Sequence, residues 1–233
     1  MQTGLCVNPG KNEVVQSDAG NYLCRALKTK LITEEDSLAG IIEEYAKPFI
    51  KKGDILFICE KAVACSQGRA FPLSSIKPGF LAGFFSRFVT KSDIGIGLAM
   101  PETMQCAIDE CGLIRILFAS AVSIAGKLLG QKGWFYHVAG YRAACIDGPC
   151  EFTIPPYNNC VVLAPLDPGR TAVNISKMLD GVTVIIVDVN DYGARIIGNS
   201  EKIDKNHIKS LLRQNPLGQD DESTPMGIIR KGE

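Results

Sequence analysis

The chain alternates short apolar runs, which are typical of buried strands, with segments whose apolar residues recur at helical spacing. One helix opens at Thr33, repeats apolar residues from Leu38 to Tyr45 and ends at Pro48, a residue type that helix interiors exclude. The apolar runs predict strands at Arg25–Ile32, Ile55–Ile58, Leu113–Ile124, Trp134–Ile146, Val161–Leu163 and Val182–Val187. The periodic segments predict further helices at Phe80–Val89, Pro101–Glu110, Pro168–Leu179 and Asp204–Arg213. The pattern as a whole indicates a mixed α/β (α+β) protein, with Glu60–Arg69 as a polar loop.

One predicted strand leads into a group of acids. Val184–Val187 consists of β-branched residues in a row, which suits a central strand covered on both faces. Asp188 and Asp191 follow this strand, and Asp147 follows another apolar run. Ligands gather where the strands of an open α/β sheet end, and carboxylate oxygens are the ligands that Mg²⁺ and Mn²⁺ prefer. An acid at a strand end is also a common turn former, so both roles remain open for each aspartate.

Composition sets the class of the protein but not its function. The chain has 233 residues, 46% of them hydrophobic, and 25 basic residues balance 25 acidic ones. This length suits one large domain or two small intertwined ones. A neutral balance argues against nucleic acid as the main partner, because phosphate backbones require a basic face. No run of 18 apolar residues is present and Met1–Gly4 opens no signal peptide, so we expect a cytoplasmic protein without a membrane partner.

Nine cysteines are many for a cytoplasmic protein. No two of them form the C-x2-C pair that zinc and iron–sulfur sites generally use, and only His137 and His207 offer nitrogen ligands. The odd number and the expected reducing compartment argue against a disulfide framework. We therefore expect most of the cysteines to act as small apolar fillers.

Several segments resemble, in the same order and spacing, the coenzyme F420-0:L-glutamate ligase (F420-0 gamma-glutamyl ligase) family. They are Lys30–Thr33, Gly53–Leu56, Glu60–Arg69, Ala143–Asp147, Leu163–Pro168, Val187–Asp188 and Gly218–Pro225. The resemblance covers most of the chain from about residue 25 onward. It implies the fold of that family, with two intertwined subdomains within residues 25–233 and an N-terminal arm or edge hairpin at residues 1–24.

The resemblance also implies an activity. Members of the family form γ-glutamyl amide bonds: GTP phosphorylates a carboxyl group of a small acceptor, and the amine of L-glutamate displaces phosphate. They are homodimers, and divalent metals lie between nucleotide and protein. For this chain the resemblance implies Mg²⁺ or Mn²⁺, and it leaves open ATP in place of GTP and a folate-like acceptor in place of a deazaflavin.

Individual residues match the functional positions of the family. Asp147 and Asp188 fall where the family places acidic metal ligands, and Gln219 falls where a glutamine ligates a second metal. The implied nucleotide contacts are Thr29, Lys30, Leu31 and Ile32, then Glu60 and Lys61, and in the C-terminal tail Leu217, Gly218, Gln219, Asp220, Asp221, Glu222, Ser223 and Thr224.

Three positions depart from the family pattern. Cys65 stands where the family carries a nucleotide-contacting Lys, Cys150 where it carries an Asn, and Val189 where it carries a hydroxyl ligand. A thiol cannot replace the point charge that a lysine offers to phosphate. Without the hydroxyl, Asn190 or Asp191 would have to supply an oxygen to a second metal. These departures keep a second hypothesis open, a non-catalytic relative that binds a metabolite or nucleotide.

Charge suggests catalytic roles for two cations. Lys61 is suited to contact phosphate, and Arg69 is suited to orient an acceptor carboxylate through a bidentate fork. A metal held by Asp147 and Asp188 would stabilise the negative charge on a transferring phosphoryl group. Lysines and arginines in exposed loops are also commonly just solvated, so the bland role remains open for Lys61 and Arg69.

Overall fold

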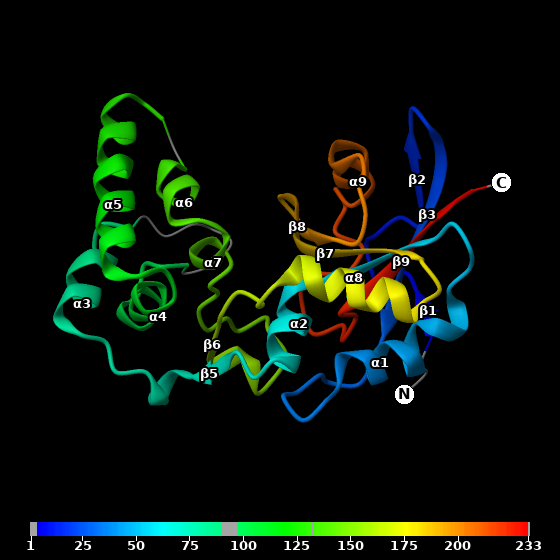
Figure 1. Ribbon diagram of the computed structural model, residues 1–233, viewed down its shortest axis with the longest axis horizontal. Coiled ribbons are helices and arrows are strands. Elements are labelled where there is room, and N and C mark those ends of the chain that lie inside the picture. Colours follow the sequence, from blue (N-terminus) through cyan, green and yellow to red (C-terminus); the bar gives the residue numbers. More distant parts are fainter. Residues whose placement is uncertain (1–3, 90–96, 132, 233) are drawn as a thin grey trace. The chain divides into compact units, whose positions relative to one another are not determined.

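The computed structural model describes residues 4–89, 97–131 and 133–232. The chain forms two compact units, the first made of Met1–Gly68 with Pro165–Glu233 and the second of Arg69–Ala164 (Figure 1). The second unit is thus inserted into the sequence of the first. Both units contain helices and strands, which confirms the mixed α/β class predicted from the apolar pattern.

The first unit is built on a seven-stranded mixed sheet. Its strands are β1 (Gly4–Cys6), β2 (Val14–Ser17), β3 (Gly20–Lys28), β4 (Ile55–Cys59), β7 (Thr183–Asn190), β8 (Gly193–Asn199) and β9 (Met226–Lys231). They lie in the order β1-β3-β9-β4-β7-β8, and β2 forms an antiparallel hairpin with β3. Among the described strands of this sheet, β4 and β7 form the parallel pair and the other neighbours are antiparallel.

Helices cover both faces of this sheet. They are α1 (Leu38–Tyr45), the 3₁₀ helix η1 (Lys47–Phe49), α2 (Glu60–Ser66), α8 (Pro168–Met178) and α9 (Lys205–Leu211). Side chains alternate between the faces of a strand, so β4 and β7 contribute to two cores. Leu56 and Val184 pack with α1, α2 and α8 on one face, whereas Phe57 and Ile185 pack with α9 on the other. This double cover explains why both strands are apolar throughout.

The second unit is mainly helical. Its helices are α3 (Phe80–Ser86), α4 (Pro101–Cys111), α5 (Leu113–Leu128), α6 (Trp134–Ala139) and α7 (Tyr141–Ala144), with the 3₁₀ helices η2 (Leu73–Ser75) and η3 (Tyr157–Asn159). A two-stranded antiparallel sheet joins β5 (Ala70–Pro72) to β6 (Cys160–Val162). Met104, Ile116 and Val161 are fully buried in its core.

Three segments differ from the prediction. Leu113–Ile124 was expected to be a strand but forms most of α5, and Trp134–Ile146, also an expected strand, contains α6 and α7. An apolar run cannot be assigned by periodicity when apolar residues surround the whole helix, as they do in α5. Glu60–Arg69 was expected to be a polar loop, yet its first seven residues form α2, whose small side chains at Ala62 and Ala64 are buried.

The first helix also begins later than expected. The N-cap of α1 is Ser37, whose hydroxyl accepts the N–H of Gly40 at 3.4 Å. Thr33 instead closes a turn with Asp36, whose carboxylate accepts the backbone N–H of Thr33 at 2.9 Å. The prediction was wrong by one turn, because two hydroxyl residues precede the same apolar stripe.

The buried cysteines have the surroundings expected of apolar fillers. Cys24 and Cys106 are 2% and 8% exposed. Burial raises the pKa of the Cys24 thiol to about 12 and, together with the nearby acid Asp109, the pKa of Cys106 to about 11. Both thiols are therefore protonated and unreactive near neutral pH.

A buried ion pair provides a test of the first unit's packing. The guanidinium of Arg230 binds both carboxylate oxygens of Asp54, at 2.8 and 2.7 Å, and the Asp54 side chain is only 2% exposed. Arg230→Met should lower the free energy of unfolding by about 3 kcal/mol, because it leaves a buried carboxylate without its cation. Urea unfolding followed by circular dichroism measures this. Lys47→Met is the matched control, since its partner Glu43 is exposed and the pair contributes about 0.5 kcal/mol or less. Equal losses in the two variants would contradict the buried-pair argument.

Candidate functional site

Two acids meet where the parallel pairing of β4 with β7 ends. Cys59 lies opposite Val187 in the parallel register, Glu60 follows Cys59 as the first residue of α2, and Asp188 follows Val187 within β7. A carboxylate oxygen of Glu60 lies within 4.8 Å of one of Asp188. Glu60 is 4% exposed and Asp188 is half-buried. The parallel register therefore brings together two carboxylates that are far apart in the sequence.

The neighbouring strands bring two further predicted segments to the same edge. Met226, the first residue of β9, pairs with Ile58 of β4 on one side and with Leu27 of β3 on the other. The tail Leu217–Thr224 precedes β9 and the segment Thr29–Ile32 follows β3, so both reach the edge where β4 ends. The backbone N–H of Thr29 donates to the carbonyl of Ser223 at 3.0 Å, and that of Cys59 donates to Pro225 at 2.8 Å.

Side chains alternate between the two faces of β7, and this separates Asp188 from its neighbour Val189. Ile186 belongs to the core beneath α2 and α8, whereas Val187 belongs to the core beneath α9, and Val189 packs against that second core. Asp188 therefore shares the α2 face with Ile186, and Val189 points to the opposite face. The side-chain oxygen of Asn190 accepts the N–H groups of Tyr192 and Gly193 at 3.0 and 3.2 Å, so it serves the β7–β8 turn.

The tail Leu217–Thr224 forms a tight loop. The Thr224 hydroxyl donates to the carbonyl of Leu217 at 2.6 Å and closes it. Gly218 has a φ of +80°, which a glycine adopts without strain. The backbone N–H of Asp220 donates to the carboxylate of Glu222 at 2.9 Å. These bonds give the predicted nucleotide-contacting tail a defined conformation.

Asn215 connects the tail to Asp191. The Nδ2 atom of Asn215 lies 3.1 Å from Oδ1 of Asp191, 2.7 Å from the Gly218 carbonyl and 3.2 Å from Oε1 of Gln219. Asn215 is fully buried, and its Oδ1 atom has no hydrogen-bond partner in the part of the chain that the structure describes. The amide thus holds two predicted metal ligands, Asp191 and Gln219, in one cluster.

The loop between β1 and β2, which belongs to the predicted N-terminal arm, contacts the same cluster. The ammonium of Lys11 donates to Oδ1 of Asp191 at 2.7 Å and holds the pKa of that carboxyl below its usual range. The Nδ2 atom of Asn8, a residue 5% exposed, donates to the Pro216 carbonyl at 3.0 Å and to the Thr224 hydroxyl at 2.9 Å. The arm and the tail therefore form one hydrogen-bonded structure around Asp191, although about 200 residues separate them.

Other predicted contacts of the first unit have local partners. Lys30 forms an ion pair of 2.6 Å with Asp36. Lys61 follows Glu60 in the first turn of α2. Cys65, further along this helix, is only 6% exposed, so the side chain at the position of the family's lysine is buried here.

Three positions named from the sequence lie in the second unit. Asp147 forms a two-way backbone bridge with Val162, with both N–H to carbonyl distances 2.9 Å. The guanidinium of Arg69 donates to the Glu110 carboxylate at 2.6 Å and to the Ala164 carbonyl at 2.6 Å. The Cys150 N–H donates to the Asn158 carbonyl at 3.1 Å. The catalytic role of Arg69 and the metal role of Asp147 stay predictions.

Three residues of this site were missed or differently assigned by the sequence analysis. Glu60 was assigned to nucleotide contact, but like Asp188 it comes at the end of an apolar run, which offered the same signal. The strand predicted to end at Val187 extends to Asn190, so Asp188 lies within β7. Lys11 offered no signal, because its partner Asp191 is 180 residues away. Asn215 has a positive φ of 48°, which marks a special backbone position but does not identify its partners.

Comparison with known proteins supports the resemblance found in the sequence. A family model described as F420-0:Gamma-glutamyl ligase matches residues 26–198, which is most of the chain. No curated protein matches the chain significantly. The arm with Lys11 and the tail with Gln219 lie outside the matched residues.

The pair of Lys11 and Asp191 predicts a pH-dependent contribution to stability. Because Lys11 lowers the pKa of Asp191, the pair stabilises the fold above the ordinary aspartate pKa, and this contribution disappears as pH falls through the lowered pKa. Lys11→Met should therefore lower the unfolding free energy by about 0.5–1 kcal/mol near pH 7, since Asp191 is half exposed, and by much less at strongly acidic pH. Urea unfolding at both pH values measures the difference. Lys202→Met, at an exposed lysine, should change neither value, and an equally large loss for Lys11→Met at acidic pH would contradict the assignment.

Proposed function

The chain belongs to the F420-0:gamma-glutamyl ligase family, and from that premise we propose that it joins L-glutamate to a small carboxylate acceptor through an acyl phosphate. Membership implies a gamma-glutamyl ligase type of function. The dependence on a nucleoside triphosphate and on a divalent metal is part of the proposal. GTP is the nucleotide expected from the resemblance, with ATP as the alternative.

The observation that supports the proposal most directly is the closeness of Glu60 and Asp188. Two carboxylates within 4.8 Å, one of them 4% exposed, place oxygen atoms close enough together for one divalent cation to bind both. Their oxygen donors fit Mg²⁺ or Mn²⁺, which prefer hard ligands. Asp147 of the second unit remains a predicted further ligand. When bound, such an ion would neutralise charge on the transferring phosphoryl group.

The nucleotide is assigned to the backbone segments that meet at the same sheet edge. Thr29–Ile32 and the tail Leu217–Thr224 are joined by the hydrogen bond from Thr29 to Ser223. Lys61 follows Glu60 directly and is the residue proposed to contact phosphate. The tail is held by its own hydrogen bonds and by Asn8, so it would meet a nucleotide with little loss of backbone freedom.

The proposed chemistry has two balanced steps. An oxygen of the acceptor carboxylate attacks the terminal phosphorus of the nucleotide, the bond to the bridging oxygen breaks, and a nucleoside diphosphate leaves. The neutral amine of L-glutamate then attacks the acyl carbon, the bond to the phosphate oxygen breaks, and the amine gives up a proton as the amide forms. The main task of the protein in such a reaction is positioning and charge stabilisation.

Two observations favour a second candidate function. Cys65 places a buried thiol where the family carries a lysine, and Val189 packs into an apolar core where the family carries a hydroxyl. A relative with these changes could retain nucleotide binding through its tail and lack turnover. The acceptor, deazaflavin or folate-like, and a homodimeric assembly also belong to the proposal.

The first test is thermal stability with added metal and nucleotide. A ligand that binds the native state at 100 times its Kd stabilises it by about 2.7 kcal/mol. Mn²⁺ should raise the Tm, and GTP or ATP should raise it further only when Mn²⁺ is present. Asp188→Asn should abolish both shifts, whereas Asp18→Asn, at an exposed residue of the β2–β3 hairpin, should leave them unchanged. If neither Mn²⁺ nor a nucleotide shifts the wild-type Tm, the proposed site is wrong.

The second test follows the oxygen atoms. Two acceptors are labelled with ¹⁸O in the carboxylate: the deazaflavin F420-0 and a folate. Each is incubated with L-glutamate, Mn²⁺ and nucleotide. An acyl phosphate transfers one labelled oxygen to the released phosphate. Labelled phosphate with an amide product supports the ligase. A metal-dependent nucleotide shift without diphosphate release for either acceptor supports the binding-only candidate.

A further inference from the structure

Helix α5 of the second unit is apolar on both its inner and its outer face. Ile116 and Ala119 are fully buried in the core, while Ile114, Phe118 and Leu128 on the outer face are 84%, 62% and 84% exposed. Leu117, Ala121, Ile124 and Ala125 complete an exposed stripe at helical spacing. A helix that is apolar all round is ordinarily covered by protein or lipid.

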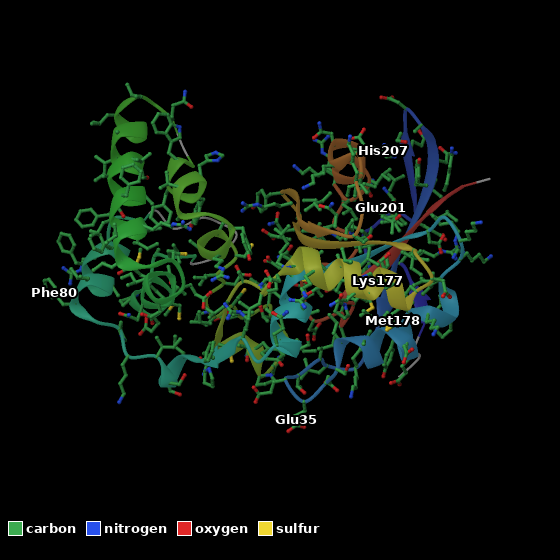
Figure 2. All side chains as sticks on the ribbon, in the orientation of Figure 1. Glu35, Phe80, Lys177, Met178, Glu201 and His207 are labelled. Carbon is green, nitrogen blue, oxygen red and sulfur yellow. The ribbon has the colours of Figure 1, made fainter. Side chains whose placement is uncertain are left out.

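Helix α3 and the residues that directly follow it add a row of aromatic rings to the surface of the same unit. Phe80, Phe84 and Phe88 recur every four residues, with ring centroids 6.5 and 5.1 Å apart along the row. Phe80 is 86% exposed and projects away from the helix (Figure 2). A row of exposed phenylalanines on a short helix is costly in water and typical of an interaction surface.

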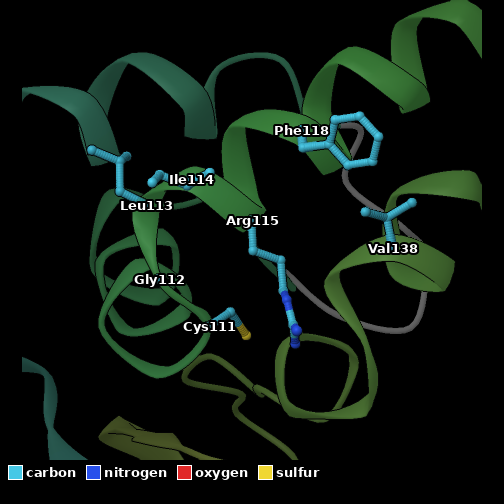
Figure 3. A pocket seen from close by; sticks show the side chains of 7 residues that line it. All are labelled: Cys111, Gly112, Leu113, Ile114, Arg115, Phe118 and Val138. Carbon is cyan, nitrogen blue, oxygen red and sulfur yellow. The ribbon is translucent and has the colours of Figure 1, made fainter.

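An open hollow lies at the start of α5. It has a volume of about 660 Å³ and is lined by Cys111, Gly112, Leu113, Ile114, Arg115, Phe118 and Val138 (Figure 3). Arg115 is the one charged residue of this lining. No ion pair joins it to another side chain in the described ranges, so its guanidinium is available to an anion.

The charges on the two helical segments themselves have a single sign, whereas α4, which packs against both, carries Glu102, Asp109 and Glu110. Residues 77–89 and 113–131 contain four lysines or arginines and no aspartate or glutamate. Lys77, Arg87 and Arg115 are exposed. The apolar surface is therefore accompanied by positive charge, the combination found in helices that lie on anionic membranes.

We propose that the exposed faces of α3 and α5 dock on the surface of an anionic phospholipid bilayer. In the described part of the chain no helix is long and apolar enough to cross a membrane. Helix α5 has 16 residues and is roughly 24 Å long, shorter than the roughly 30 Å hydrocarbon core. The contact is thus interfacial: Phe80 and Phe118 enter the acyl boundary, and Arg87 and Arg115 meet headgroup phosphates. The expectation of no membrane partner rested on the lack of a spanning segment, which does not exclude surface contact.

A second copy of the chain fits this surface less well. In a twofold interface the same patch meets itself, so Arg87 and Arg115 would be brought toward the cations of the partner. Anionic headgroups instead supply the opposite charge. Lipid docking does not depend on the ligase activity, and either proposal can fail without the other.

The test is sedimentation of the full-length protein with vesicles. Binding is expected with phosphatidylcholine vesicles that contain phosphatidylglycerol, and little binding with phosphatidylcholine alone. Arg87→Gln and Arg115→Gln should each weaken binding roughly fivefold, as expected for one cation near an anionic surface. Phe118→Ser should weaken it as well. Phe152→Ser is the matched control, because Phe152 is 65% exposed in the same unit but outside both helices.

The single tryptophan offers an independent readout. Trp134 packs against Gly126 of α5, and the chain has no other tryptophan. Brominated phosphatidylglycerol should quench its fluorescence in the wild type and less in Phe118→Ser. The proposal is overturned by absent sedimentation with phosphatidylglycerol, by equal binding to neutral vesicles, or by an equal loss in Phe152→Ser. It is also overturned if Phe118→Ser dissociates an oligomer while vesicle binding is unchanged, which would assign the surface to a second copy.

Discussion

The parallel pairing of β4 with β7, flanked by the antiparallel β9, is the constraint on which the candidate site depends. Cys59 opposite Val187 fixes Glu60, at the start of α2, beside Asp188 of β7, and Met226 opposite Ile58 fixes where the tail joins the sheet. A shift of one residue in either register would turn the side chains to the opposite face. The apolar cores on both faces prevent such a shift, because Ile58 and Ile186 are buried on one side and Phe57 and Val187 on the other.

The same alternation explains the altered position Val189. On a strand covered on both faces, consecutive residues serve different surroundings, and a valine directed at the α9 core is stabilised by burial. Cys65 is similar, since it lies in a helix whose small residues face the core. At both positions, a side chain that packs in or against an apolar core thus replaces the polar or charged side chain of the family pattern. The N-terminal arm brings a cation to this cluster, because Lys11 pairs with Asp191, which Asn215 links to Gln219 of the tail.

The two units present different physical character. The first concentrates acids and hydrogen-bonded backbone at one edge of a sheet, which suits a polar, charged ligand. The second presents apolar helices accompanied by cations, which suits a lipid surface. The net charge of the whole chain is zero and does not reveal this difference, because it sums the charges of both units.

The mixed α/β class, the helices α3, α4, α8 and α9 and the strand that delivers Asp188 could be determined from the sequence, because apolar periodicity is a local property. The resemblance also predicted that Thr29–Ile32, Glu60 and the tail contact one nucleotide. The pairing of Glu60 with Asp188, the Lys11–Asp191–Asn215 cluster and the helical state of α5 could not. The first two depend on strand register and on contacts across about 180 residues, which leave no local pattern. Helix α5 lacks a polar face, so periodicity could not assign it, and only the tertiary structure decided which of its apolar residues are buried and which are exposed.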